Sequence, residues 1–147
     1  MRVLLVCSPG GHLQEMLALR RAWEGLETTW VTLSGPDVAH LRATERVVLG
    51  HGPTNRSLTK LVRNLVLAWR LVGRERPDAI LSTGAALAVP FFLVGRLRGL
   101  RLVYVESLAR TEGLSLSGRM VAPLADEVFV QWPGARRRGL RYVGSIL

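Results

Sequence analysis

Short apolar runs alternate with longer amphipathic segments along this chain, and this alternation constrains the fold more than any other feature. Two of the runs, Arg2–Cys7 and Leu100–Val105, are apolar at most positions, which is typical of strands buried on both faces of a sheet. Between such runs apolar residues recur at helical spacing, as they do from Leu13 to Trp23. The pattern predicts an α/β fold: a single Rossmann-like, doubly wound parallel sheet covered by helices on both faces.

The expected elements follow one another without a break in organisation. Strands are predicted at Arg2–Cys7, Thr28–Leu33, Arg46–Leu49, Ala79–Ser82, Leu100–Val105, Glu127–Val130 and Tyr142–Val143. Helices are predicted at Leu13–Trp23, Asp37–Ala43, Ser57–Arg74, residues 86–98 and Leu114–Leu124. The length of 147 residues matches one compact domain, and no repeat or linker divides it. We therefore expect a single domain over residues 1–147.

The charge balance is strongly basic, with 20 Lys+Arg against 11 Asp+Glu and a net charge of +9. Lys60 is the one lysine, so the positive charge is nearly all arginine. Guanidinium groups suit phosphates on nucleic acid, anionic lipid or a diphosphate ligand, although a GC-rich genome gives the same composition. A single cysteine, Cys7, excludes an internal disulfide and suits a reducing compartment. The longest apolar stretch, Ala85–Gly95, is about half a membrane span, so no segment is expected to cross a bilayer.

Three loops that follow predicted strands carry the polar residues of a candidate site, because ligands bind outside the carboxyl ends of parallel strands. The first loop contains Gly10, Gly11 and His12. Glycine amides at a helix N-terminus suit a phosphate, and His12 could act as a general base. A solvent-exposed or capping histidine is the alternative. The full dinucleotide-binding fingerprint G-x-G-x-x-G is absent.

The other two loops have the sequences Ser82-Thr83-Gly84 and Glu106-Ser107-Leu108-Ala109-Arg110. The second loop could donate hydrogen bonds to an anion, or its hydroxyl residues could simply cap the next helix. A carboxylate at the end of a buried strand needs a partner. Glu106 could bind sugar hydroxyls or orient a base, and Arg110 could bind a phosphate or pair with Glu106. Together the three loops predict an anion and sugar site at one edge of the sheet.

These segments also resemble a known family, the asparagine-linked glycosylation 14 family and its bacterial PssD-type relatives in polysaccharide biosynthesis. The matching segments occur in family order over nearly the whole chain: Gly10-Gly11-His12-Leu13-Gln14-Glu15-Met16, Ser82-Thr83-Gly84 with Pro90, Val103-Tyr104-Val105-Glu106-Ser107, Arg110 with Leu114-Ser115-Leu116-Ser117-Gly118, Ala125-Asp126, Val130-Gln131-Trp132-Pro133 and Tyr142-Val143-Gly144.

The resemblance implies the N-terminal, acceptor-side half of a MurG-like GT-B glycosyltransferase. Such a half binds a polyprenyl-diphosphate-linked acceptor, while a separate PssE-like subunit binds the UDP-sugar. Carried onto this chain, the resemblance implies that Gly10, Gly11 and His12 approach the diphosphate and the reaction centre. We expect His12 as the catalytic base, with Glu106 second. The expected acceptor- and phosphate-binding residues are Gly10, Gly11, Ser82, Thr83, Gly84, Ser107 and Arg110.

No cofactor and no metal site are expected, and the location implied is the cytoplasmic face of the plasma membrane. Eukaryotic members carry an N-terminal transmembrane anchor, whereas this chain starts at the first strand, so membrane contact is expected from the surface. The helix at Ser57–Arg74, with Trp69 among arginines, is the first candidate, and Ala85–Gly95 with Phe91 and Phe92 is the second. Both segments could instead be core.

Two other functions are open from sequence. The chain could be a non-catalytic scaffold that recruits the transferase to the membrane. Its charge of +9 could also bind nucleic acid, although no recognition motif accompanies it, and we expect no nucleic-acid partner.

Overall fold

The computed structural model describes residues 1–54 and 56–146, which form one seven-stranded sheet with every strand parallel to its neighbour. The strands are β1 (Arg2–Cys7), β2 (Glu27–Thr32), β3 (Val47–Leu49), β4 (Ala79–Gly84), β5 (Arg101–Val105), β6 (Glu127–Val130) and β7 (Arg141–Tyr142). Their order across the sheet is β3-β2-β1-β4-β5-β6-β7. The chain therefore changes direction across the sheet between β1 and β4, the kind of switch point where open α/β sheets bind ligands. The predicted fold class is confirmed.

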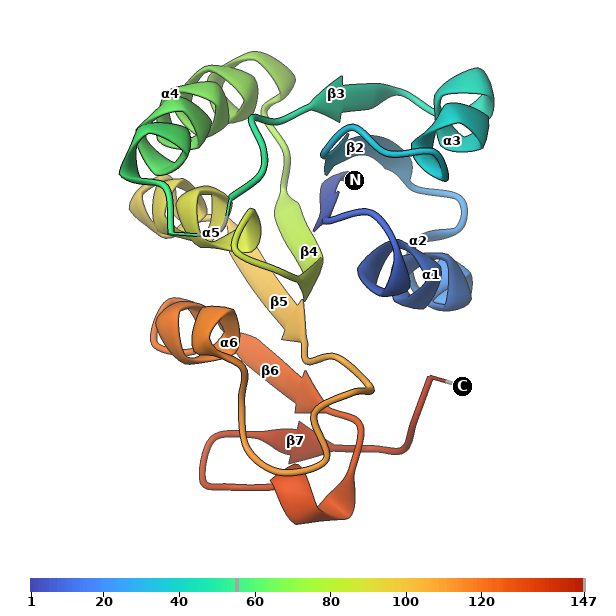
Figure 1. The fold of residues 1–147 in the computed structure, drawn as a ribbon, viewed down its shortest axis with the longest axis vertical. Coiled ribbons are helices and arrows are strands. Elements are labelled where there is room, and N and C mark those ends of the chain that lie inside the picture. Colours follow the sequence, from blue (N-terminus) through green and yellow to red (C-terminus); the bar gives the residue numbers. More distant parts are fainter. Residues whose placement is uncertain (55, 147) are drawn as a thin grey trace.

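Helices cover both faces of the sheet (Figure 1). They are α1 (Gly11–Ala18), α2 (Arg20–Trp23), α3 (Val38–Thr44), α4 (Leu58–Glu75), α5 (Ala88–Leu97) and α6 (Leu116–Val121), with a short 3-10 turn η1 at Pro133–Ala135. Because strand–helix–strand crossovers are right-handed, connections that run in opposite directions across the sheet place their helices on opposite faces. Accordingly α1, α2 and α3 lie on one face, and α4, α5 and α6 lie on the other.

Each face has its own apolar core. Under α1 to α3, the rings of Trp23 and Trp30 meet edge to face with centroids 5.4 Å apart. Under α4 to α6, Phe91 and Phe92 are fully buried. The prediction that Phe91 and Phe92 present the segment Ala85–Gly95 to a membrane is therefore wrong, because α5 packs against α4, α6 and the sheet. Cys7 is also fully buried, as its position in β1 predicted.

Two predicted helices differ in extent from the observed ones. The helix predicted over Leu13–Trp23 is divided into α1 and α2, because Leu19 closes α1 by donating its N–H to carbonyls of α1. The helix predicted over Leu114–Leu124 is shorter and begins after Ser115. The Ser115 hydroxyl accepts the N–H of Gly118 at 3.0 Å, which is an N-cap.

The α4 helix has both a buried and an exposed apolar face. Its buried residues are Asn64, Ala68, Leu71 and Val72. Its exposed apolar residues are Leu58, Val62, Val66 and Trp69. The helix therefore packs as a core element and still leaves an apolar strip on the surface. No helix in the described part of the chain is long and apolar enough to cross a bilayer.

Candidate functional site at the carboxyl edge of the sheet

The carboxyl ends of β1, β4 and β5 bring the three predicted loops together. These strands are adjacent in the sheet. The N–H of Ser8 donates to the carbonyl of Gly84 at 3.1 Å, so the first and second loops are joined directly. A carboxylate on α1 accepts two hydrogen bonds from the third loop, at Ser107 and Leu108. The loops lie at one edge, as expected from sequence, and their role in substrate binding stays a prediction.

His12 lies in the first turn of α1, and its ring is held by β4. Nδ1 is 2.7 Å from the carbonyl oxygen of Thr83, and the Thr83 hydroxyl donates to the carbonyl of His12 at 2.6 Å. A carbonyl can only accept, so Nδ1 carries the proton and the neutral ring has its lone pair on Nε2. The side chain is 28% exposed. His12 is therefore a partly exposed imidazole that does not cap α1 and is held in one tautomer at the edge of the site, and its role as the base stays a prediction.

Glu15 is a site residue that the sequence reasoning missed. It lies one helical turn after His12 and is 5% exposed. Its Oε2 is 3.8 Å from His12 Nδ1, and its Oε1 accepts the Leu108 N–H at 2.7 Å and the Ser107 hydroxyl at 3.2 Å. The spacing of three residues between a histidine and a glutamate on one helix was the available signal.

The surroundings of His12 raise its pKa above the usual value of 6.5. Interaction with Glu15 is the largest cause, burial opposes it, and the Thr83 carbonyl and the more distant charge of Glu106 add to the rise. The buried hydroxyl of Tyr104 belongs to the same cluster: desolvation raises its pKa, and the charge of Glu106 raises it further. A raised pKa makes the His12 imidazole a stronger base.

The Gly10 amide already has an anionic partner. Gly10 has a positive φ of 81°, and its N–H donates to a carboxylate oxygen of Asp37 at 2.7 Å. A phosphate that took this N–H would have to displace Asp37, which the sequence reasoning also missed. The N–H groups of Gly11 and His12 lie in the first turn of α1, where a helix provides no internal acceptor. They are better placed than Gly10 to receive an anion.

The second loop holds His12 and does not cap the next helix. Helix α5 begins at Ala88, with Leu87 in the N-cap position. The Ser82 hydroxyl instead accepts the N–H of Gly84 at 3.1 Å. Gly84 has a φ of 112°, and a Cβ there would lie 2.9 Å from the His12 ring. The alternative of simple N-capping is wrong, and the loop forms the wall against which the ring of His12 packs.

Glu106 is enclosed by donors from its own loop. The side chain is 1% exposed. Its Oε1 accepts the N–H of Ser107 at 2.9 Å, and its Oε2 accepts both the N–H and the hydroxyl of Ser115, each at 2.9 Å. The alternative of an ion pair between Glu106 and Arg110 is wrong, because Ser115 and Ser107 satisfy the carboxylate and Arg110 is exposed on the loop. These contacts favour His12 over Glu106 as the base.

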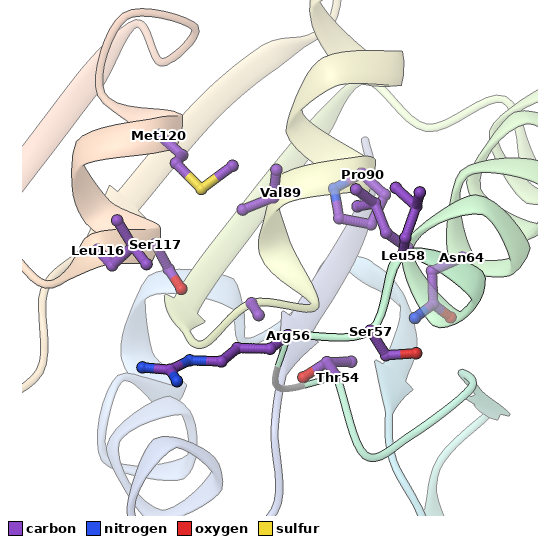
Figure 2. A pocket seen from close by; sticks show the side chains of 12 residues that line it. Thr54, Arg56, Ser57, Leu58, Asn64, Val89, Pro90, Leu116, Ser117 and Met120 are labelled. Atoms are coloured by element: carbon purple, nitrogen blue, oxygen red, sulfur yellow. The ribbon is translucent and has the colours of Figure 1, made fainter.

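An apolar groove opens beside this edge, between α4, α5 and α6 (Figure 2). It has a volume of about 300 Å³. Figure 2 shows Leu58 on one side, Leu116 and Met120 on the other, and Pro90 between them, with the Arg56 side chain extended beneath. The groove is therefore lined mostly by apolar side chains, with the Arg56 side chain along one of its sides.

Solved structures of similar fold are twice the size of this chain. The MurG of Acinetobacter baumannii superposes with a TM-score of 0.81 over 98% of this chain and 45% of that chain, at 16% sequence identity. A UDP-GlcNAc 2-epimerase from Methanocaldococcus jannaschii superposes with a TM-score of 0.73 over 99% of this chain and 46% of that chain, at 13% identity. At these identities the likeness shows the fold alone: this chain has the fold of just under half of each of these chains.

Sequence relatives point to one family. The chain is 39% identical over 127 residues to the "UDP-N-acetylglucosamine transferase subunit ALG14" of Eremothecium gossypii, over 77% of this chain and 55% of the relative. It is 33% identical over 94 residues to the human subunit of the same name, over 58% of this chain and 44% of that relative. The chain thus spans about half the length of these relatives. The sequence profile described as "Oligosaccharide biosynthesis protein Alg14 like" matches residues 40–146, well over half of the chain, and the chain therefore belongs to the Alg14 family.

Proposed function

We propose that this chain is the acceptor-binding subunit of a two-component glycosyltransferase. The complex would transfer a sugar, from UDP-GlcNAc or another UDP-sugar, to a polyprenyl-diphosphate-linked acceptor at the cytoplasmic face of the membrane. The observation that carries the proposal is His12, a base held in one tautomer at the switch point of the sheet, in a chain whose relatives are named UDP-N-acetylglucosamine transferase subunits. Residues 1–147 would act as one acceptor-binding domain.

The acceptor is proposed to lie along the groove and the first turn of α1. The diphosphate would take the N–H groups of Gly11 and His12 at the N-terminus of α1, with Arg110 and Arg56 as exposed cations nearby. The apolar groove continues onto the exposed strip of α4 and α6, where Leu58 and Leu116 are each 74% exposed. A ligand with one charged end and one hydrocarbon end would match this arrangement of backbone N–H groups and arginines next to an apolar groove.

The proposed chemistry is a displacement with inversion at the anomeric carbon. Nε2 of His12 takes the proton of the acceptor hydroxyl while that oxygen forms a bond to the anomeric carbon of the donor sugar. The bond from that carbon to the UDP oxygen breaks, and UDP leaves with the bonding electrons. The acceptor hydroxyl must be held close to the donor carbon, so positioning contributes much of the rate.

The donor is proposed to come from a PssE-like partner, without which the chain would be inactive. An unpartnered apolar surface supports this. Helices α5 and α6, which connect β4 to β5 and β5 to β6, lie on the same face of the sheet as α4. On the opposite face only α1 and α2 lie near β5 and β6, and they cover only the margin of these strands. An apolar cavity of about 320 Å³ remains there, lined in part by Leu19, Val103, Phe129 and Val143.

The decisive experiment is reconstitution. The chain alone, a donor-binding partner alone and the two together are assayed on membranes with a panel of UDP-sugars. We expect transfer to lipid only from the combination. Transfer by the chain alone would contradict the two-component proposal.

A second experiment uses a His12 variant to distinguish a catalytic role of this chain from a role in recruitment alone. His12→Ala should reduce turnover by about 10²-fold or more, the typical contribution of a general base, while partner binding and membrane association are retained. His40→Ala, an exposed histidine on α3, is the matched control and should retain full turnover. Unchanged turnover in His12→Ala would favour the alternative function, a non-catalytic recruitment scaffold.

A further inference from the structure

Glu15 is a buried carboxylate beside His12 that the proposed reaction does not use. It is 5% exposed. Its Oε1 is bonded to Ser107 and Leu108, but its Oε2 has no hydrogen-bond partner among the described residues. A buried carboxylate oxygen without a donor is costly. A neighbouring group that becomes positively charged would lower that cost.

The His12 ring is that neighbour. At 3.8 Å, the separation of Nδ1 from Glu15 Oε2 is too long for a hydrogen bond and short enough for an ion pair. The Nδ1 proton is already engaged by the Thr83 carbonyl, so the ring stays fixed when it gains a second proton. The other ionisable groups around the ring are Glu106, in the loop after β5, and the hydroxyl of Tyr104 on β5, which adjoins Gly84 as the ring does.

We propose that Glu15 is a positioning residue that stabilises the His12 imidazolium as it forms and ties α1 to the third loop. The inference rests on the proposed function, in which His12 Nε2 takes a proton from the acceptor hydroxyl. That proton transfer adds one positive charge to a ring 3.8 Å from Oε2. No proton passes to Glu15. It acts as the buried carboxylate behind a catalytic histidine does, by orientation and charge.

The first test is a titration that needs neither substrate nor partner. The chain has three histidines, His12, His40 and His51, and NMR follows each imidazole separately, with His12→Gln to assign its signal. In Glu15→Gln the amide oxygen can still accept from the third loop, but the charge is gone. We expect the pKa of His12 to fall, while His40 and His51 titrate as before. Glu15→Asp, which keeps the charge, should restore part of the shift.

A matched control is Glu24→Gln, which removes an exposed carboxylate at the end of α2 and should leave the titration of His12 unchanged. If His12 titrates in Glu15→Gln as it does in the unsubstituted chain, the inference is overturned. Should Glu15→Gln fail to fold, the comparison of Glu15→Asp with the unsubstituted chain decides, because a purely structural Glu15 would leave the pKa of His12 unmoved.

The second test uses the assembled two-component enzyme. In Glu15→Gln we expect kcat to fall about 10-fold, a part of the roughly 10²- to 10⁴-fold that a general base contributes, with KM little changed. The acidic limb of the pH profile should move to lower pH. A raised KM with unchanged kcat and an unmoved pH profile would mean that Glu15 only holds the third loop, and would overturn the inference. If Glu15→Gln lowers the pKa of His12 but His12→Ala leaves turnover unchanged, the proposed function is wrong. The electrostatic interaction of Glu15 with His12 would then still be supported.

Discussion

Gly118 leaves room for the third loop because it has no side chain. It lies in α6 against the carboxylate that organises that loop, and a Cβ at Gly118 would collide with Oε2 of Glu106. Gly118→Ala should therefore lower the free energy of unfolding by about 1–3 kcal/mol, the usual cost of overpacking. Gly73→Ala is the matched control, since Gly73 is also helical and a Cβ there would meet only the end of the Arg98 side chain, at 3.9 Å. It should be neutral or stabilising by up to about 1 kcal/mol. Urea denaturation measures both; equal effects would contradict the packing argument.

His12 should make stability depend on pH. Its pKa is raised in the folded protein above the usual value of 6.5, so the folded state binds the proton more tightly than the unfolded state does. The resulting stabilisation is complete below the unfolded-state pKa and is lost as pH rises through the higher folded-state pKa. Urea unfolding from about pH 5 to about pH 9 should show this loss, and His12→Gln should abolish it. The same pH dependence in His12→Gln as in the unsubstituted chain would refute the assignment.

Glu15 and Asp37, the two site residues that the sequence reasoning missed, act through contacts between distant segments. Glu15 meets Leu108 across 93 positions, and Asp37 meets Gly10 across 27. Neither pair has a local pattern, because side-chain hydrogen bonds between loops depend on the three-dimensional path of the chain. Gly10, Gly11 and His12 were recognisable because a glycine pair and a polar residue after a buried strand form a local signal.

At the scale of elements, burial explains what could be predicted. The strand Arg2–Cys7 was placed correctly, since it is buried at every position after Arg2 and a strand buried on both faces is a continuous apolar run. The range predicted for α4, Ser57–Arg74, differs by one residue at each end from the observed range, Leu58–Glu75. In the structure Ser57 is the N-cap. The break at Leu19 between α1 and α2 was missed, because helical periodicity continues through it. Phe91 and Phe92 were assigned to two possible surfaces because an apolar run alone does not say whether protein or lipid covers it.

The exposed strip of α4 should bind anionic lipid. Trp69 is 51% exposed and Val62 is likewise 51% exposed; the guanidinium of Arg98 lies 3.9 Å from the Trp69 ring centroid. An interfacial tryptophan beside arginines is a common membrane anchor. Trp69→Ser should weaken binding to vesicles that contain anionic lipid by about 10-fold, and added salt should weaken the binding of the unsubstituted chain.

Leu17→Ser is the control for this helix, since Leu17 is an exposed apolar residue of α1, on the opposite face of the sheet. Co-sedimentation with vesicles measures both variants. Equal loss in the two variants, or binding to neutral vesicles as strong as to anionic ones, would show that α4 is not the specific contact.

At the scale of the molecule, the two faces of the sheet are unequally covered. Helices α4 to α6 and the apolar groove lie on one face, whereas on the other face α1 to α3 leave the cavity beside Val103 and Phe129 open. An exposed apolar surface of this kind is where the proposed donor-binding subunit would pack. The proposed lipid contact on the α4 face and the proposed partner contact on the opposite face would then not compete, as the proposed transfer to a membrane-bound acceptor requires.

This division can be tested by placing charge in the cavity. Val103→Arg and Val143→Arg each put a guanidinium on that surface, where burial of an unpaired charge against a partner is costly. Each should weaken association with the donor-binding subunit by about 10-fold or more, which is about 1.4 kcal/mol, and leave vesicle binding unchanged. Leu97→Arg, 71% exposed on α5, is the matched control and should leave association intact. Because Val143 is 75% exposed, its substitution tests the surface without disturbing the core. Association of normal strength in both cavity variants, measured by isothermal titration, would place the partner on another surface and leave this cavity without a role in assembly.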